Sequence, residues 1–191
     1  MLQIIIEPNE KYTLGEMGQM AVEGGAAWII LRCNGMSDNQ IKEETSDLIS
    51  LCRESGTILT IENHYKLAES LGIHGVFATD KTLQAQFLRN TMGPEAMIGM
   101  LVSTATQAYH LESADIDYAA VDNRETGLDI LSDLRGKSNM YPIVLCGDFG
   151  IEDLPAIVAD GFSGICTGKT AFESKDPAEY ISNMLSTLSK Q

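Results

Sequence analysis

The chain has 191 residues, the length of about one domain. Hydrophobic residues make up 44% and charged residues 21%, which are globular values and exclude a disordered chain. Thirteen Lys+Arg against 27 Asp+Glu give a formal net charge of −14. Because phosphate backbones and anionic membrane surfaces are bound by clustered basic side chains, we expect neither a nucleic-acid partner nor a membrane partner.

Two further features indicate the compartment. No apolar run approaches the roughly 18 residues of a transmembrane helix, and the strand pattern Leu2 to Ile6 follows the first residue with no basic segment before it. The four cysteines show no CxxC spacing, so reduced thiols are favoured over a disulfide or metal cluster. We therefore expect a cytoplasmic protein.

Short apolar runs recur eight times along the chain. Each is rich in Ile, Val or Leu and continuous, a pattern typical of strands buried on both faces of a parallel sheet. The predicted strands are Leu2–Ile6, Ala27–Leu31, Ile58–Ile61, Gly75–Ala78, Met97–Val102, Tyr118–Val121, Pro142–Cys146 and Ser163–Cys166.

Helical patterns separate these strands. Thr13 and Ser37 each begin a capping-box pattern, with Glu or Gln three residues later. Asp80 is predicted to precede a third helix. Asp176, followed by Pro177, predicts the start of the last one.

Eight strand–helix units of about 24 residues each predict a single-domain (β/α)₈ TIM barrel over residues 1–191. The alternative is a doubly wound open sheet. That fold usually has a glycine-rich first turn, whereas the first predicted strand here ends in Glu7-Pro8-Asn9.

Polar side chains follow all eight predicted strands, at the end where this fold carries its chemistry. They predict a shared pocket, although strand ends also become polar simply because they meet loops. The candidate site residues are Arg32, Asn34, Glu62, Asn63, His64, Asp80, Ser103, Thr104, Asp122, Gly147, Asp148, Gly168, Lys169 and Thr170.

The last two strand ends predict a phosphate site. Gly147 and Gly168 would let backbone N–H groups approach an anion, and Lys169 would add a positive charge. Asp148 opposes this interpretation because a carboxylate repels phosphate. The alternative is that these are turn glycines beside a solvated lysine.

His64 is the histidine expected at the mouth of the barrel, beside Glu62, and the two form a candidate acid/base pair. An ordinary polar loop residue is the alternative for His64. Cys33 and Cys166 also follow or end strands, but buried structural thiols are favoured over nucleophiles there.

The order of these motifs resembles the thiamine phosphate synthase / TenI superfamily over nearly the whole chain. Ile30-Leu-Arg32-Cys-Asn34-Gly35 stands where that superfamily has Gln-x-Arg-x-Lys-Gly. Glu62-Asn63 stands at its Asn-Asp pair, and Asp80-Lys81 at its Gln-Asp. Pro142 to Phe149 is similar to its strand-seven loop, and Ala159-Asp-Gly-Phe162 to its Ala-Asp-Gly-Val run.

The resemblance implies an enzyme of thiamine biosynthesis, a transferase that joins a pyrimidine diphosphate to a thiazole phosphate with Mg²⁺. It implies that Arg32, Glu62 and Asp122 are catalytic residues and that Glu62 and Asp80 hold a possible Mg²⁺. The remaining candidates would bind the substrate. It also implies a possible homodimer.

Several superfamily positions differ, so we expect synthase turnover to be slow or absent. The Gln and Lys of the arginine motif are Ile30 and Asn34, and the superfamily's strand-six lysine loop is missing. We predict a barrel that binds a thiazole phosphate, a thiamine phosphate or a diphosphate at its mouth. The alternatives are a repurposed, non-catalytic phosphate-binding barrel and a TenI-like thiazole tautomerase with Ser103 or Thr104 in place of the usual histidine.

Overall fold

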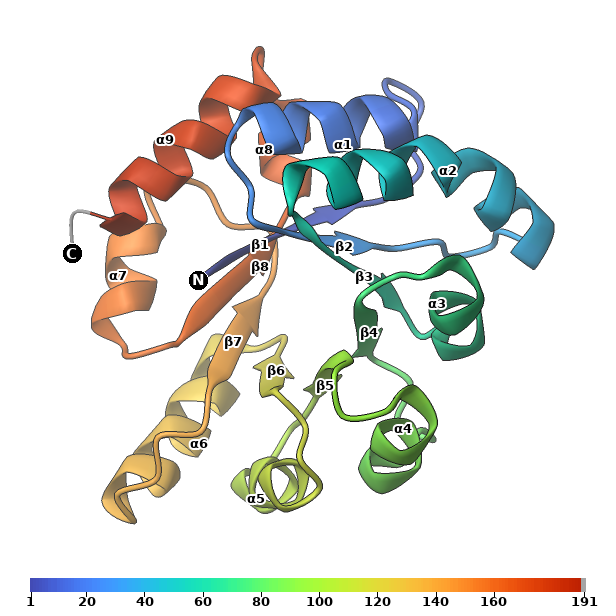
Figure 1. Ribbon diagram of the computed structural model, residues 1–191. Helices are drawn as coiled ribbons and strands as arrows, with labels where there is room; N and C mark the ends of the chain where they lie inside the picture. Colours follow the sequence, from blue (N-terminus) through green and yellow to red (C-terminus); the bar gives the residue numbers. More distant parts are fainter. Residues whose placement is uncertain (190–191) are drawn as a thin grey trace.

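The computed structural model describes residues 1–189, which form a closed barrel of eight parallel strands paired in chain order (Figure 1). The (β/α)₈ prediction is confirmed, and residues 190–191 of the predicted domain lie outside the described residues. The strands are β1 (Leu2–Ile6), β2 (Trp28–Leu31), β3 (Ile58–Glu62), β4 (Gly75–Ala78), β5 (Met97–Leu101), β6 (Tyr118–Val121), β7 (Ile143–Cys146) and β8 (Gly164–Thr167).

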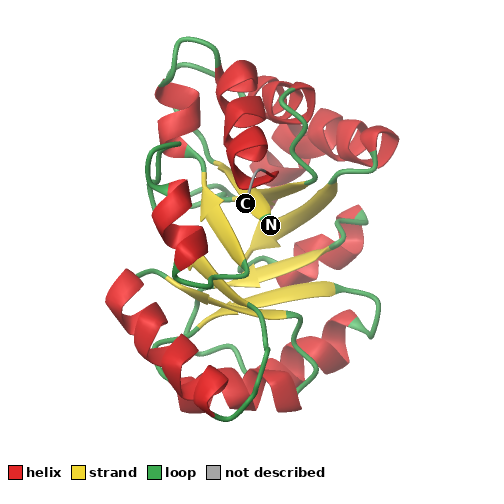
Figure 2. Cartoon of the chain, turned by 90° about the vertical axis from the view of Figure 1, so that its left-hand side faces the viewer, coloured by secondary structure: helices red, strands yellow, loops and turns green. Residues whose placement is uncertain are grey.

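Helices cover the outside of the barrel and leave its mouth to the loops that follow the strands (Figure 2). Among the described residues, no helix is both long enough and apolar enough to span a bilayer. The helices are α1 (Leu14–Glu23), α2 (Asp38–Ser55), α3 (Tyr65–Leu71), α4 (Ala85–Met92), α5 (Ala105–Ser113), α6 (Arg124–Gly136), α7 (Leu154–Ala159), α8 (Lys169–Glu173) and α9 (Pro177–Ser189).

Side-chain caps fix where several helices begin. Thr13 and Ser37 form the two predicted capping boxes, and Asp176 accepts a hydrogen bond from the Glu179 N–H. α4 follows Asp80 as expected, but it begins only at Ala85, so Asp80 does not cap it. The Asp80 carboxylate instead accepts both the N–H and the hydroxyl of Thr82, at 2.8 Å each, which forms a tight turn.

A separate apolar cluster fills the inside of the barrel, so packed side chains close the barrel below its mouth. Trp28 and Tyr118 meet edge to face with ring centroids 5.5 Å apart, and the Trp28 indole N–H donates to Thr60. Tyr118 lies directly over Gly99, where a Cβ would stand 2.0 Å from its ring. The cluster comprises Trp28, Ile30, Phe77, Tyr118, Ala120, Val144 and Cys166.

Candidate functional site

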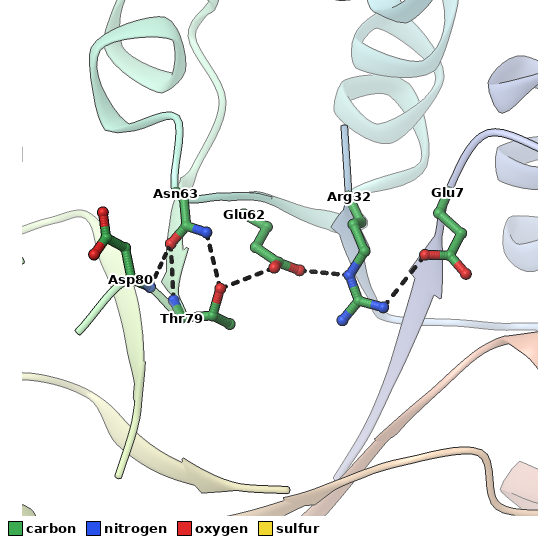
Figure 3. A network of polar contacts seen from close by, with 6 residues as sticks. All are labelled: Glu7, Arg32, Glu62, Asn63, Thr79 and Asp80. Atoms are coloured by element: carbon green, nitrogen blue, oxygen red, sulfur yellow. Dashed lines mark hydrogen bonds and ion pairs between the residues drawn. The ribbon is translucent and has the colours of Figure 1, made fainter. Parts of the chain in front are cut away.

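Arg32 lies between two carboxylates at the mouth of the barrel (Figure 3). Its Nε–H donates to Glu62 at 2.7 Å, and one terminal nitrogen donates to Glu7 at 3.3 Å. The side chain of Glu62 is only 8% exposed, against 29% for Arg32 and 46% for Glu7. Burial alone lowers the pKa of Arg32, but the hydrogen bonds and charges of Glu62 and Glu7 outweigh it and raise that pKa.

The register of the sheet explains this pairing. Leu31 of β2 is aligned with Ile61 of β3, so Arg32 and Glu62 stand side by side one residue further along. Because side chains alternate across a strand, both follow residues that face the helices and themselves turn toward the barrel axis. The strand pairing therefore builds the ion pair.

Hydrogen bonds extend the Arg32–Glu62 pair toward β4 (Figure 3). The Thr79 hydroxyl donates to the second Glu62 oxygen at 2.9 Å and accepts from the Asn63 amide at 2.8 Å. The side-chain oxygen of Asn63, Oδ1, accepts hydrogen bonds from the backbone N–H groups of Thr79 and Asp80. Asn63 has a left-handed backbone, φ 61°, in which it can make all these bonds. The side-chain amide of Asn63, which was predicted to bind substrate, therefore forms its hydrogen bonds within the protein.

A pocket of about 500 Å³ opens beside this network, within the usual size range of small-molecule sites. It brings together Arg32, Asp148, Gly168 and Lys169, four of the residues predicted from the sequence. The full lining is Ile5, Glu7, Asn9, Glu10, Lys11, Met17, Arg32, Asp148, Gly168, Lys169, Phe172 and Glu173.

Close backbone packing accounts for the glycine at the end of β8. A Cβ on Gly168 would stand 2.0 Å from the carbonyl oxygen of Ile5 in β1, so a larger residue would push these strands apart. Thr167 fixes the facing loop, since its hydroxyl oxygen accepts the Phe149 N–H at 3.1 Å. The Gly147 N–H donates to the Cys166 carbonyl at 3.0 Å and is already engaged in the sheet.

The remaining predicted residues lie away from the pocket lining. Asn34 and Asp122 are exposed. Ser103 and Thr104 cap α5, because the Ser103 hydroxyl donates to Gln107 and the Thr104 hydroxyl accepts the Gln107 N–H. His64 precedes α3 without capping it through its side chain, and Thr170 lies within α8.

Lys11 is a pocket residue that the sequence analysis missed. It lies in the loop between β1 and α1, and its ammonium group donates to the carbonyl oxygens of Phe172 and Ser174 at 3.4 Å each. No motif marks it. Its one signal is its position, four residues beyond Glu7, in the first loop of the barrel mouth.

The two predicted Mg²⁺ ligands differ in how far their oxygens are already engaged. Both Glu62 oxygens accept short hydrogen bonds from Arg32 and Thr79, and one Asp80 oxygen accepts two from Thr82. Over residues 1–189, no three His, Cys, Asp or Glu side chains gather in a metal-binding group. Mg²⁺ coordination by Glu62 would require its bonds to Arg32 and Thr79 to be exchanged for metal–oxygen bonds. Asp80, in contrast, could use the oxygen that does not bind Thr82.

The pocket therefore combines cations with an excess of carboxylates. Lys11, Arg32 and Lys169 face Glu7, Glu10, Asp148 and Glu173 around its wall. Arg32 is neutralised by its carboxylate partners, whereas Lys11 and Lys169 both lie at the β8–α8 side. The two lysines could contact an anionic group there, opposed by the carboxylate of Glu173 on the same helix as Lys169, and Glu7 could accept a hydrogen bond from a ligand.

Comparison with known proteins agrees with this architecture. The family model described as thiamine monophosphate synthase matches residues 2–170. The thiamine-phosphate synthase of Bacteroides thetaiotaomicron is 29% identical, with 93% of this chain and 92% of that protein covered. The Bacteroides fragilis thiamine-phosphate synthase is 28% identical, at 96% and 98% coverage.

A solved structure has the same fold. The thiamine phosphate pyrophosphorylase from Pyrococcus furiosus superposes with a TM-score of 0.86 at 19% identity, covering 99% of this chain and 95% of that one. Since the family model spans most of the barrel, from β1 into α8, the predicted resemblance is confirmed. This chain belongs to the thiamine monophosphate synthase family.

Proposed function

We propose that this family member binds a thiazole phosphate, or a closely related phosphorylated ligand, in the pocket at the barrel mouth and turns it over slowly or not at all. The phosphate would lie at the β8–α8 side, near Lys169, Lys11 and the backbone of Gly168. Glu7 and Arg32, which directly follow the neighbouring strands β1 and β2, would contact the remainder of the ligand.

One observation carries this proposal: Arg32 and Lys169 line the same pocket, although they stand 137 positions apart in the sequence. A family ligand that bears phosphate needs local cations in a protein of net charge −14. Lys169 supplies such a charge at an exposed position beside the buried Gly168.

Slow turnover is expected because Arg32 is already paired with two carboxylates. A departing diphosphate develops negative charge that preorganised cations must stabilise. Arg32 already has two carboxylate partners, and Asn34 is an exposed amide where the family motif has a lysine. The pocket thus favours phosphate binding over diphosphate departure.

The tautomerase alternative has less support. Ser103 and Thr104 occupy the position of the TenI histidine, and their hydroxyls are engaged in capping α5. A hydroxyl with a pKa far above neutrality is also a poor proton shuttle. No observation favours this activity over ligand binding.

Calorimetric titration of the purified protein tests the proposal. Thiazole phosphate, thiamine phosphate and pyrophosphate are titrated separately, each with and without Mg²⁺. We expect saturable binding of at least one phosphorylated ligand that does not require the metal. Absence of binding by all three would contradict the proposal. The cytoplasmic location and the homodimer remain predictions, and light scattering after gel filtration tests the latter.

A further inference from the structure

Two cysteines lie side by side at the mouth of the barrel. Cys146 ends β7 and Cys166 lies near the end of β8, and the parallel register aligns the two residues directly. Aligned residues of neighbouring strands point to the same face: Cys166 belongs to the cluster that fills the barrel, and Cys146 packs against it. Both thiols are free in the structure.

The spacing of aligned strands suits a disulfide bond. Neighbouring strands run about 4.8 Å apart, within the roughly 4.4–6.8 Å Cα separation that disulfides span. Parallel Cβ vectors keep the Cβ atoms near that same spacing, slightly beyond the preferred separation of about 3.8 Å. A bond formed here would draw the strand ends together by part of an ångström, and the resulting strain would make it easy to reduce.

The two thiols differ in access. Cys166 is fully buried, whereas Cys146 is partly exposed at the mouth. The Cys146 thiol, together with burial, raises the pKa of Cys166 well above its ordinary value, which shows how closely the two groups interact. A small oxidant entering the mouth would therefore meet Cys146 first.

Unpaired polar atoms surround the buried partner. Gln3 is aligned with Cys166 from the other side, on β1, and is completely buried. Neither amide atom of Gln3 nor the Tyr118 hydroxyl has a hydrogen-bond partner among the described residues. Such groups are rare in protein interiors, and here the Gln3 amide and the Tyr118 hydroxyl could donate to the Cys166 sulfur as that thiol loses its proton.

We propose that Cys146 and Cys166 form a reversible dithiol/disulfide site for peroxide-type oxidants. The Cys146 sulfur attacks hydrogen peroxide, the O–O bond breaks, and a sulfenic acid and one water form. The Cys166 sulfur then attacks the Cys146 sulfur, the S–O bond breaks, and the hydroxide leaves with the Cys166 proton as a second water. Two thiols lose two electrons and peroxide gains them.

Peptide mapping tests this site directly. Reduced native protein is treated with hydrogen peroxide, its remaining thiols are alkylated in denaturant, and it is digested with trypsin and a glutamate-specific protease. No Lys or Arg lies between Cys146 and Cys166, but Glu152 does, so double digestion separates the two cysteines unless a disulfide joins them.

We expect the alkylated thiols to fall from four to two, the two peptides to remain joined, and dithiothreitol to reverse both changes. Separate peptides, with Cys166 alkylated and Cys146 oxidised alone, would overturn the proposal. This readout needs no ligand, so a failure of phosphate binding leaves it intact.

Two cysteine variants are compared, so that a loss of stability in one of them does not decide the test. In Cys166→Ser the sulfenic acid at Cys146 cannot be resolved, so dimedone labelling of Cys146 should exceed that of the unmodified protein. Cys52→Ala, which changes a buried thiol of α2, should form the same disulfide as the unmodified protein. Equal dimedone labelling in all three proteins would contradict the resolving role of Cys166.

Discussion

The Nε–H of Arg32 donates a 2.7 Å hydrogen bond to Glu62, at the neighbouring ends of β2 and β3. Glu62 is almost fully buried, so this bond holds the arginine against the inner wall of the mouth. Glu7 binds the same guanidinium from β1. The family's arginine is therefore present, with two carboxylate partners that would oppose its contact with the phosphorylated ligand of the proposed function.

Removing the charge of Glu62 should strengthen phosphate binding. In Glu62→Gln one of the two carboxylates on Arg32 becomes neutral, and we expect the calorimetric Kd for thiazole phosphate to fall about fivefold, roughly 1 kcal/mol. Glu69→Gln, an exposed change in α3, is the control. Weaker or unchanged binding in Glu62→Gln would show that Arg32 does not face the ligand.

Removing Lys169 should weaken phosphate binding without unfolding the protein. A hydrogen bond to a charged group contributes roughly 1.5–3 kcal/mol, so Lys169→Ala should raise the Kd by about tenfold to 150-fold. Lys137→Ala removes an exposed lysine that pairs with Asp133 outside the pocket, and should leave the Kd unchanged. The same affinity in both variants would remove Lys169 from the site.

Asn63 should stabilise the mouth through both its backbone and its side chain. Asn63→Ala loses the bonds to Thr79 and Asp80 and puts alanine, which tolerates the left-handed backbone less well than asparagine, at this position. We expect it to cost about 2–3 kcal/mol in urea unfolding. Asn63→Gly should recover about 1 kcal/mol of this loss, because glycine accepts positive φ. Equal stability of the two variants would mean that the backbone conformation contributes nothing.

Buried thiols should make the protein less stable at alkaline pH. Burial raises the pKa of Cys52 from 9.0 to about 11. The unfolded chain therefore ionises first, and the stability that is present below about pH 9 is lost as the pH rises toward 11. Two pKa units correspond to roughly 2–3 kcal/mol. Urea unfolding under reducing conditions should show a smaller loss over this range in Cys52→Ala, and an identical loss would contradict the assignment.

Much of the fold follows from local patterns. Eight continuous apolar runs predict the strands, and the capping residues Thr13 and Ser37 predict two helix starts. The helix expected after Asp80 is present as α4, but it begins only at Ala85, because the Asp80 side chain binds Thr82 in a turn and does not cap the helix.

The site could be predicted only in part, because strand ends indicate which residues approach the mouth but not where each side chain points. Arg32, Asp148, Gly168 and Lys169 do line one pocket. The bond between Arg32 and Glu62 depends on strand register, which the sequence pattern does not specify.

Synthase turnover tests the central claim most directly. The purified protein is incubated with Mg²⁺, the pyrimidine diphosphate and the thiazole phosphate, and thiamine phosphate is quantified over time. With Arg32 neutralised and Asn34 in place of the family lysine, we expect a rate at least about 10³-fold below the roughly 10 s⁻¹ of a typical enzyme, alongside measurable binding of the thiazole phosphate. Turnover at about 1 s⁻¹ or faster would contradict the account and show that the Glu7–Arg32–Glu62 arrangement opens when substrate binds.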